Sequence, residues 1–158
     1  MDKTPEDKAF DQACGFLSYR PRTRHELVGY LAKRGWNDIT EIVMERLERA
    51  GLVDDTEFAT AWIRERATAK GYGRRRLMSE LTRLGVERRT IDAALDDEYP
   101  AETETDRAAG LAAERWRRLS TVDPYKKGQQ VFGYLVRRGF AAGAAKEAVD
   151  ALIRGERD

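Results

Sequence analysis

Residues 27–36 read LVGYLAKRGW, and the same skeleton returns at residues 77–86 as LMSELTRLGV and at residues 131–140 as VFGYLVRRGF. Each copy has two apolar residues four positions apart, then a glycine four positions later, followed by a large apolar residue. Apolar residues four positions apart share one face of an α-helix, and glycine commonly ends a helix in the left-handed conformation. The glycines are spaced by 50 and then 54 residues, so the skeleton predicts one structural unit used three times.

Apolar spacings of three and four continue along the rest of the chain, and strictly alternating β-branched runs are absent. This pattern predicts an all-α protein. Thr23 and Glu26 have the spacing of a capping box, and Asp123-Pro124 is a typical helix start. We expect three tandem three-helix, helix-turn-helix-like repeats in an elongated, curved array. The predicted repeats span residues 7–52, 53–98 and 104–154.

The clearest boundary in the sequence is Tyr99-Pro100 with the acidic residues that follow as far as Asp106. We expect the array to flex most easily there, and the first helix of the third repeat to begin near Thr105. The four additional residues of the third repeat are expected in the connection at residues 120–126. The three tryptophans lie in the apolar stripes, so core packing is the favoured interpretation over base stacking for Trp36, Trp62 and Trp116.

The bulk composition limits the possible classes of protein. The 158 residues are 41% hydrophobic and 36% charged, and the net charge is only +1, which excludes a globally basic nucleic-acid binder. No apolar run approaches the roughly 20 residues of a transmembrane helix, and no secretory segment follows Met1. One cysteine and one histidine exclude an internal disulfide and argue against a zinc site. We expect a cytoplasmic protein with no membrane association, no metal and no other cofactor.

Basic residues gather in the front part of each predicted repeat, and acidic residues gather at its end. Between residues 64 and 89 the local net charge is +6. Such a face is either solvated surface with pairs at i and i+4, or a surface that holds phosphates. Three arginines at the start of a helix oppose the helix dipole, which favours a binding role for residues 74–76. The candidate binding residues are Arg20, Arg22, Arg24, Arg34, Arg64, Arg66, Lys70, Tyr72, Arg74, Arg75, Arg76, Lys126, Lys127, Arg137 and Arg138.

The residues that usually carry catalysis have simpler interpretations in this sequence. Asp54 and Asp55 follow a hydrophobic lead-in, which favours helix capping over a pair of catalytic carboxylates. His25 has no serine or cysteine nucleophile nearby, and Cys14 lies on an apolar helical face. The segment from Gly71 to Gly73 lacks a preceding strand and a phosphate-loop lysine, although Tyr72 within it is a candidate for stacking on a base. We expect no catalytic residues and no enzyme.

Residues 51–85, GLVDDTEFATAWIRERATAKGYGRRRLMSELTRLG, resemble the central repeat of the RecX family, which regulates the RecA recombinase. The flanks agree, with residues 20–27 similar to the first unit of that family and residues 132–140 similar to its third. The resemblance covers about residues 8–153. Arg74 departs from the pattern, because the family often has proline there, and residues 100–127 match loosely.

The resemblance implies binding to the RecA protein, within the groove of the filament that RecA forms on single-stranded DNA. It implies a monomer that restrains the recombinase, ATPase and co-protease activities of RecA in DNA repair and the SOS response, with contact to single-stranded and also double-stranded DNA. A different interpretation stays open from the residues alone. In that interpretation the protein is a stand-alone DNA-binding transcriptional regulator that uses the helix at residues 74–84 as its recognition helix.

Overall fold

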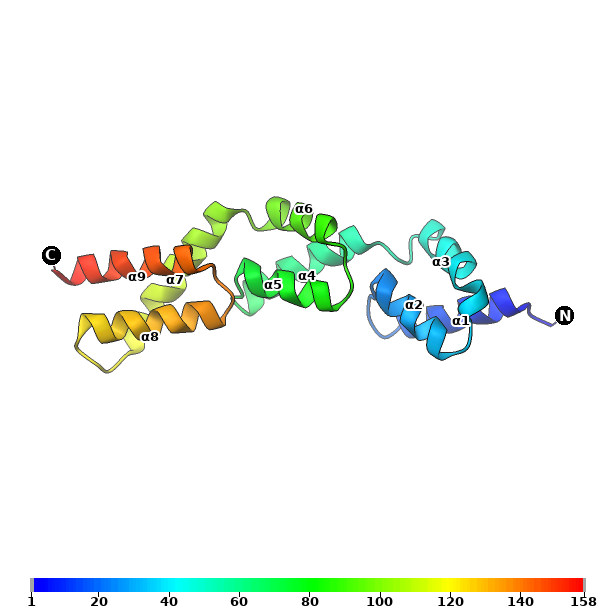
Figure 1. The fold of residues 1–158 in the computed structure, drawn as a ribbon, viewed down its shortest axis with the longest axis horizontal. Helices are drawn as coiled ribbons and strands as arrows, with labels where there is room; N and C mark the ends of the chain where they lie inside the picture. The colour runs from blue at the N-terminus through cyan, green and yellow to red at the C-terminus, as the bar shows by residue number, and fades with distance from the viewer. Residues whose placement is uncertain (1, 158) are drawn as a thin grey trace. The chain divides into compact units, whose positions relative to one another are not determined.

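A computed structural model describes residues 2–157, and within this range it contains nine α-helices, one short 3-10 helix and no strand (Figure 1). The predicted all-α class is therefore confirmed. The helices are α1 (Pro5–Leu17), α2 (Arg24–Lys33), η1 (Asn37–Ile39), α3 (Thr40–Arg49), α4 (Asp55–Ala69), α5 (Arg74–Arg83), α6 (Arg88–Glu98), α7 (Ala101–Arg118), α8 (Pro124–Arg137) and α9 (Ala142–Arg157).

The α-helices follow one another in three sets of three, and the middle helix of each set carries the repeated skeleton. α2, α5 and α8 each end two residues before the skeleton glycine. Gly35, Gly85 and Gly139 have φ angles of 84°, 83° and 92°. A side chain on Cβ disfavours this left-handed region, which is why glycine recurs at the end of each middle helix.

The chain divides into two compact units, and each unit combines two separate segments. The first is Met1–Ala61 with Leu81–Ile91, and the second is Trp62–Glu80 with Asp92–Asp158. Each helix of the second set contributes residues to both units.

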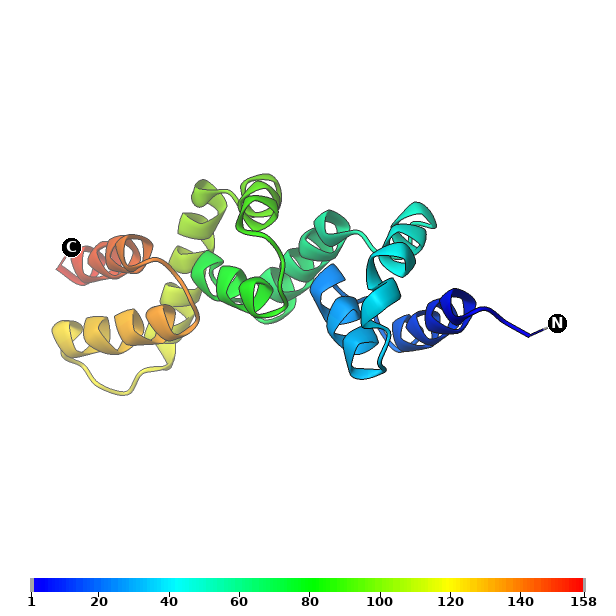
Figure 2. The ribbon, with the colours of Figure 1, turned by 45° about the vertical axis from the view of Figure 1, so that its right-hand side comes forward.

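In the first unit, α1, α2 and α3 fold against one another (Figure 2). Their shared core contains the two skeleton leucines of α2, which are fully buried. The indole of Trp36 packs at the edge of this core, and its Nε1–H donates to Gln12 Oε1 at 2.8 Å. Cys14 is half-buried at the same edge, as its apolar face predicts. The buried members are Ala9, Ala13, Leu27, Leu31, Val43, Met44, Leu47 and Val53.

In the second unit, α7, α8 and α9 form a second core, in which α8 and α9 lie side by side (Figure 1). Trp116 is buried here, which confirms its predicted core position, and its Nε1–H donates to Glu156 at 2.9 Å. Trp62 is only half-buried and donates to Glu80. The buried members are Ala108, Ala112, Trp116, Val131, Leu135, Phe140, Ala145, Ala148 and Val149.

The acidic stretch after Pro100 is helical, so the predicted break as far as Asp106 is wrong. α7 begins at Ala101, directly after Pro100. Carboxylates in the first turn of a helix interact favourably with its dipole, and this explains why an acidic run is helical here. Glu104 is only 4% exposed, and its Oε1 accepts the N–H of Ala141 at 2.9 Å, directly before α9. Tyr99 is fully buried. The connection therefore consists of two residues rather than a flexible linker.

The four additional residues of the third repeat lengthen α8 rather than the loop before it. α2 and α5 each have 10 residues, whereas α8 has 14 and begins at Pro124. Asp123 Oδ1 accepts the N–H of Tyr125, and the Asp123 carbonyl accepts the N–H of Lys127. The predicted helix start at Asp123-Pro124 is thus confirmed, and the insertion adds one helical turn.

Candidate binding surface

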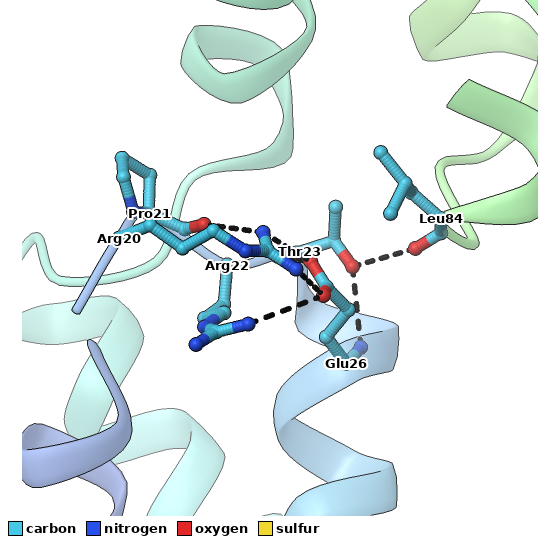
Figure 3. A network of polar contacts seen from close by, with 6 residues as sticks. All are labelled: Arg20, Pro21, Arg22, Thr23, Glu26 and Leu84. Atoms are coloured by element: carbon cyan, nitrogen blue, oxygen red, sulfur yellow. Dashed lines mark hydrogen bonds and ion pairs between the residues drawn. The ribbon is translucent and has the colours of Figure 1, made fainter. Parts of the chain in front are cut away.

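Thr23 joins the start of α2 to the end of α5 within the first unit (Figure 3). Its Oγ1 accepts the N–H of Glu26, and Glu26 Oε1 accepts the N–H of Thr23, both at 3.1 Å, which confirms the predicted capping box. The same hydroxyl donates to the carbonyl oxygen of Leu84 at 2.6 Å. Thr23 is fully buried, so this polar side chain is satisfied by both contacts.

We call the contact of Thr23, at the start of α2, with Leu84, at the end of α5, a joint. Gly85 lies directly against His25 at this joint. A Cβ atom at Gly85 would overlap the Cβ and Cγ atoms of His25. Glycine at position 85 therefore serves two purposes, because it has a positive φ and it lets two segments approach. His25 is exposed despite this contact.

A second joint of the same design lies within the second unit. The N–H of Gly73 donates to the carbonyl oxygen of Arg138 at 2.9 Å, and the N–H of Arg75 donates to that of Gly139 at 3.0 Å. A Cβ atom at Gly139 would overlap the backbone and Cβ of Arg76. In both joints, the glycine that ends one middle helix rests on the start of the middle helix in the preceding set.

Two of the predicted binding arginines converge on Glu26 of the capping box (Figure 3). Arg20 donates to both carboxylate oxygens and to the carbonyl of Pro21. Arg22 lies 3.8 Å from Glu26 Oε2, and its guanidinium stacks 3.8 Å from the ring centroid of Phe16. Only 13% of the Arg22 side chain is exposed, so this arginine supports the fold of the first unit.

Other predicted arginines pair with the acidic ends of their own repeats. Arg24 lies 3.0 Å from carboxylate oxygens of Glu41 and Glu48. Arg64 makes two hydrogen bonds to Glu98, of 2.7 and 2.8 Å, and these bonds lower the pKa of that carboxyl. The separation of basic front and acidic end along the sequence is therefore partly reversed by the fold, because the two ends meet.

Two further predicted arginines, Arg66 and Arg74, pair with carboxylates of the second unit. Arg66 stacks 3.5 Å from the ring centroid of Trp62 and lies 3.8 Å from Glu80. Arg74 lies 3.1 Å from Asp96 Oδ1. Both arginines keep less than a quarter of their side chains exposed. Their charges are compensated within the chain and are less accessible to a partner than the sequence suggests.

A second group of predicted cations has no carboxylate partner among the described residues. Arg75 and Arg137 are exposed and make no side-chain hydrogen bond there. Arg34 lies over the ring of Tyr30, at 5.0 Å. Lys127 lies at the same distance over Trp116. The full group is Arg34, Lys70, Arg75, Arg76, Lys126, Lys127, Arg137 and Arg138.

The fold brings Tyr72, Arg76 and Arg138 together from segments far apart in the sequence. The guanidiniums of Arg76 and Arg138 lie 3.8 and 5.6 Å from the centroid of the Tyr72 ring. Arg138 also donates to the carbonyl oxygens of Lys70 and Gly71. Tyr72 is half-buried, so the exposed stacking ring expected from its glycine neighbours is not what the structure contains.

Tyr134 and Arg115 join this group, although neither is among the binding residues that the sequence predicts. Arg138 lies 5.4 Å from the Tyr134 ring centroid, and Arg115 lies 5.0 Å from it. A signal was present for Tyr134, because the sequence Gly-Tyr-Leu-x-x-Arg-Gly occurs at both 29–35 and 133–139. Tyrosine and arginine four positions apart share a helix face, so the repeated motif points to the ring under the arginine.

The paired aspartates at the start of α4 have separate structural partners. Asp54 Oδ1 accepts the N–H of Glu57 at 3.1 Å, which confirms its capping role. Asp55 Oδ1 accepts the backbone N–H of Arg24 at 2.9 Å, and burial raises the pKa of the Asp55 carboxyl.

Within residues 2–157, no group of three histidine, cysteine or acidic side chains is arranged to hold a metal ion. In the same range, no helix is both long and apolar enough to cross a membrane.

Comparison with known protein families gives three matches along this chain. Models of the first, second and third three-helix domains of RecX match residues 9–47, 54–95 and 102–149. Each match contains most of one of the three helix sets.

The chain is also similar to proteins named "Regulatory protein RecX". The relative from Mycobacterium sp. (strain KMS) is 37% identical, over 97% of this chain and 86% of the relative. The relative from Mycolicibacterium vanbaalenii is 40% identical, over 90% of this chain and 80% of the relative.

Two solved structures share the fold. A crystal structure of regulatory protein RecX superposes with a TM-score of 0.78 at 25% identity, over 92% of this chain and 73% of the other. The crystal structure of RecX from Lactobacillus salivarius has a TM-score of 0.82 at 21% identity, and covers 95% of each chain.

Proposed function

Because this chain belongs to the RecX family of regulatory proteins, we propose that it binds the RecA recombinase and the filament that RecA forms on single-stranded DNA. In this proposal it restrains the ATPase, recombinase and co-protease activities of RecA during DNA repair and the SOS response. It acts in the cytoplasm, as a monomer and without a cofactor.

The observation that carries the proposal is the match of all three helix sets, in order, to the three domains of one regulatory family. The two joints support it, because Gly85 and Gly139 each let the end of one middle helix lie directly against the start of the middle helix in the preceding set. Repeats that touch their neighbours build extended binding surfaces, which suit a long partner better than a small molecule.

Arg34, Arg75 and Arg137 are the strongest candidates for contacts with the filament. Each is exposed and has no carboxylate partner among the described residues. Arg24, Arg64 and the other arginines that pair with carboxylates would have to give up an ion pair before binding. Contact with DNA, single-stranded and double-stranded, belongs to the same proposal through this uncompensated group.

The stand-alone transcriptional regulator receives less support from the geometry. A recognition helix contacts base edges through its N-terminal residues. In α5, the N–H of Arg75 is bonded to Gly139, and the Arg74 side chain is paired with Asp96. The start of α5 is thus already in contact with another part of its own unit.

The proposal is tested by titrating the protein into RecA, single-stranded DNA and ATP while ATP hydrolysis is measured. We expect turnover to fall at well below one molecule of this protein per RecA. An unchanged rate at equimolar protein would contradict the proposal. A footprint on a specific duplex sequence in the absence of RecA would support the transcriptional regulator instead.

A further inference from the structure

Five side chains in the second unit alternate between arginine and tyrosine in successive contacts, and we call them the arginine–tyrosine row. Their order is Arg76, Tyr72, Arg138, Tyr134 and Arg115. The distances from guanidinium to ring centroid along the row are 3.8, 5.6, 5.4 and 5.0 Å. Each lies within the roughly 6 Å range of a cation–π contact.

The row draws its members from four parts of the second unit. Arg76 is in α5, Tyr72 is in the link before α5, Tyr134 and Arg138 are in and directly after α8, and Arg115 is in α7. A guanidinium that lies over a ring has less rotamer freedom to lose when it binds a ligand. The row therefore holds three cations in place before any partner arrives.

The charges of this row are not compensated within the chain. Among the described residues, Arg76, Arg115 and Arg138 have no carboxylate within ion-pair distance. Three other arginines that stack on rings differ in this respect, because each also lies within 4 Å of a carboxylate. These are Arg22 beside Glu26, Arg46 beside Asp7 and Arg66 beside Glu80.

From this geometry we infer that the arginine–tyrosine row binds the phosphodiester backbone of a single-stranded nucleic acid. Planar guanidiniums match phosphate oxygens through paired N–H donors. The two rings already carry arginines, so they are not free platforms for bases, and binding is independent of base sequence. The inference rests on the proposed function and deepens it, because it names the group that would contact DNA.

A nucleic-acid backbone fits the row better than an acidic protein surface does. Successive guanidiniums are separated by one ring, so the row presents a repeated positive charge. A phosphodiester chain presents a repeated negative charge at each nucleotide. The covalent structure of a folded protein fixes no such regular spacing of surface carboxylates.

The test measures binding of a fluorescein-labelled oligo(dT) to the full chain in the absence of RecA. The double variant Arg76→Gln with Arg115→Gln removes the two end cations, whose side chains make no hydrogen bond or ion pair among the described residues. We expect affinity at low salt to fall about tenfold or more, since two charge-assisted contacts are lost. The slope of log affinity against log salt concentration should become shallower by about 1.4, since two phosphate contacts are lost and each contributes about 0.7.

A matched control removes the same charge elsewhere. Arg49→Gln with Arg118→Gln removes two exposed arginines that pair with Glu45 and Glu114. This control should bind oligo(dT) within about twofold of the parent.

A third pair of variants separates the contribution of the ring from that of the charge. Tyr134→Leu should weaken binding severalfold by releasing two guanidiniums, whereas Tyr134→Phe keeps the ring and should bind like the parent.

Three results would overturn the assignment. In the first, the row variant binds oligo(dT) as tightly as the parent. In the second, the control variant loses as much affinity, which would show only an effect of net charge. In the third, the row variant keeps oligo(dT) binding but loses binding to RecA, which would assign the row to a protein partner. Because oligo(dT) binding is measured without RecA, failure of this inference is distinguishable from failure of the proposed regulation.

Discussion

Thr23 Oγ1 lies 2.6 Å from the carbonyl oxygen of Leu84, a residue 61 positions further along the chain. One hydroxyl therefore caps α2 and binds the end of α5 at the same time (Figure 3). The equivalent joint in the second unit uses backbone N–H groups of Gly73 and Arg75 in place of a hydroxyl. The two joints therefore occupy equivalent positions in the fold, although different chemical groups form them.

The double role of Thr23 predicts a larger stability loss than that of an ordinary helix cap. Thr23→Val removes the cap of α2 and leaves the Leu84 carbonyl without its partner. We expect the free energy of unfolding to fall by about 2–3 kcal/mol, as measured by urea denaturation. Thr4→Val is the matched control, because Thr4 caps α1 at an exposed position, and it should cost about 1 kcal/mol. Equal losses in the two variants would argue against the link to Leu84.

Alanine variants at Gly85 and Gly35 distinguish two causes of lost stability. One is the close approach of two segments, and the other is a positive φ. Both residues have φ near 84°, but nothing lies within 4 Å of a Cβ atom at Gly35, whereas His25 occupies that place at Gly85. Gly35→Ala should destabilise the protein by about 1–2 kcal/mol through backbone strain alone. Gly85→Ala should cost about 1–3 kcal/mol more, because the joint must open. Similar melting temperatures for the two variants would show that the joint tolerates a methyl group.

Reversing the charge of Arg75 disturbs fewer contacts than reversing the charge of its neighbours on α5. Its side chain is exposed, and only its backbone N–H takes part in the joint with Gly139. Arg75→Glu should preserve helicity, should raise the melting temperature slightly because a carboxylate in the first turn suits the helix dipole, and should weaken inhibition of the RecA ATPase severalfold. Arg74→Glu, by contrast, would place two carboxylates together at Asp96 and would also destabilise the protein. Full inhibition by Arg75→Glu would show that this position is solvated surface.

We expect the buried phenol of Tyr99 to make the stability of the protein sensitive to alkaline pH. Burial, together with the nearby Glu104, raises the pKa of the Tyr99 phenol from 10.0 to about 12. Between these values the folded state holds a proton that the unfolded state releases, so stability falls as pH rises from about 10 to about 12. The contribution of this residue is at most about 2–3 kcal/mol. Tyr99→Phe should remove that part of the alkaline loss in denaturation midpoints measured at pH 9 and pH 12. Identical alkaline losses in the parent and the variant would contradict the assignment.

Local features of this fold are predictable from the sequence. The skeleton glycines follow from helical periodicity and the left-handed conformation, and both signals lie within ten residues. The capping box at Thr23 is equally local, because its partner Glu26 is three positions away. The central motif at residues 51–85 is specific enough to indicate the family.

Contacts between distant segments are not predictable in this way. The link from Thr23 to Leu84 and the contact of Glu104 with Ala141 each join helices that no local pattern pairs. The acidic run after Pro100 resembles a linker in composition, yet its carboxylates stabilise a helix start. For the same reason, the distribution of charge along the sequence suggests more accessible basic side chains than the fold contains. It gives no sign that Glu98 lies beside Arg64 or that Asp96 lies beside Arg74.

The most direct test of the proposed regulation is the length of RecA filaments on circular single-stranded DNA, measured by electron microscopy with and without this protein. At one molecule per ten or more RecA molecules, we predict clearly shorter filaments, and Arg75→Glu should restore much of the length. Filaments of unchanged length at this ratio and at equimolar protein would contradict the proposal that this chain restrains RecA.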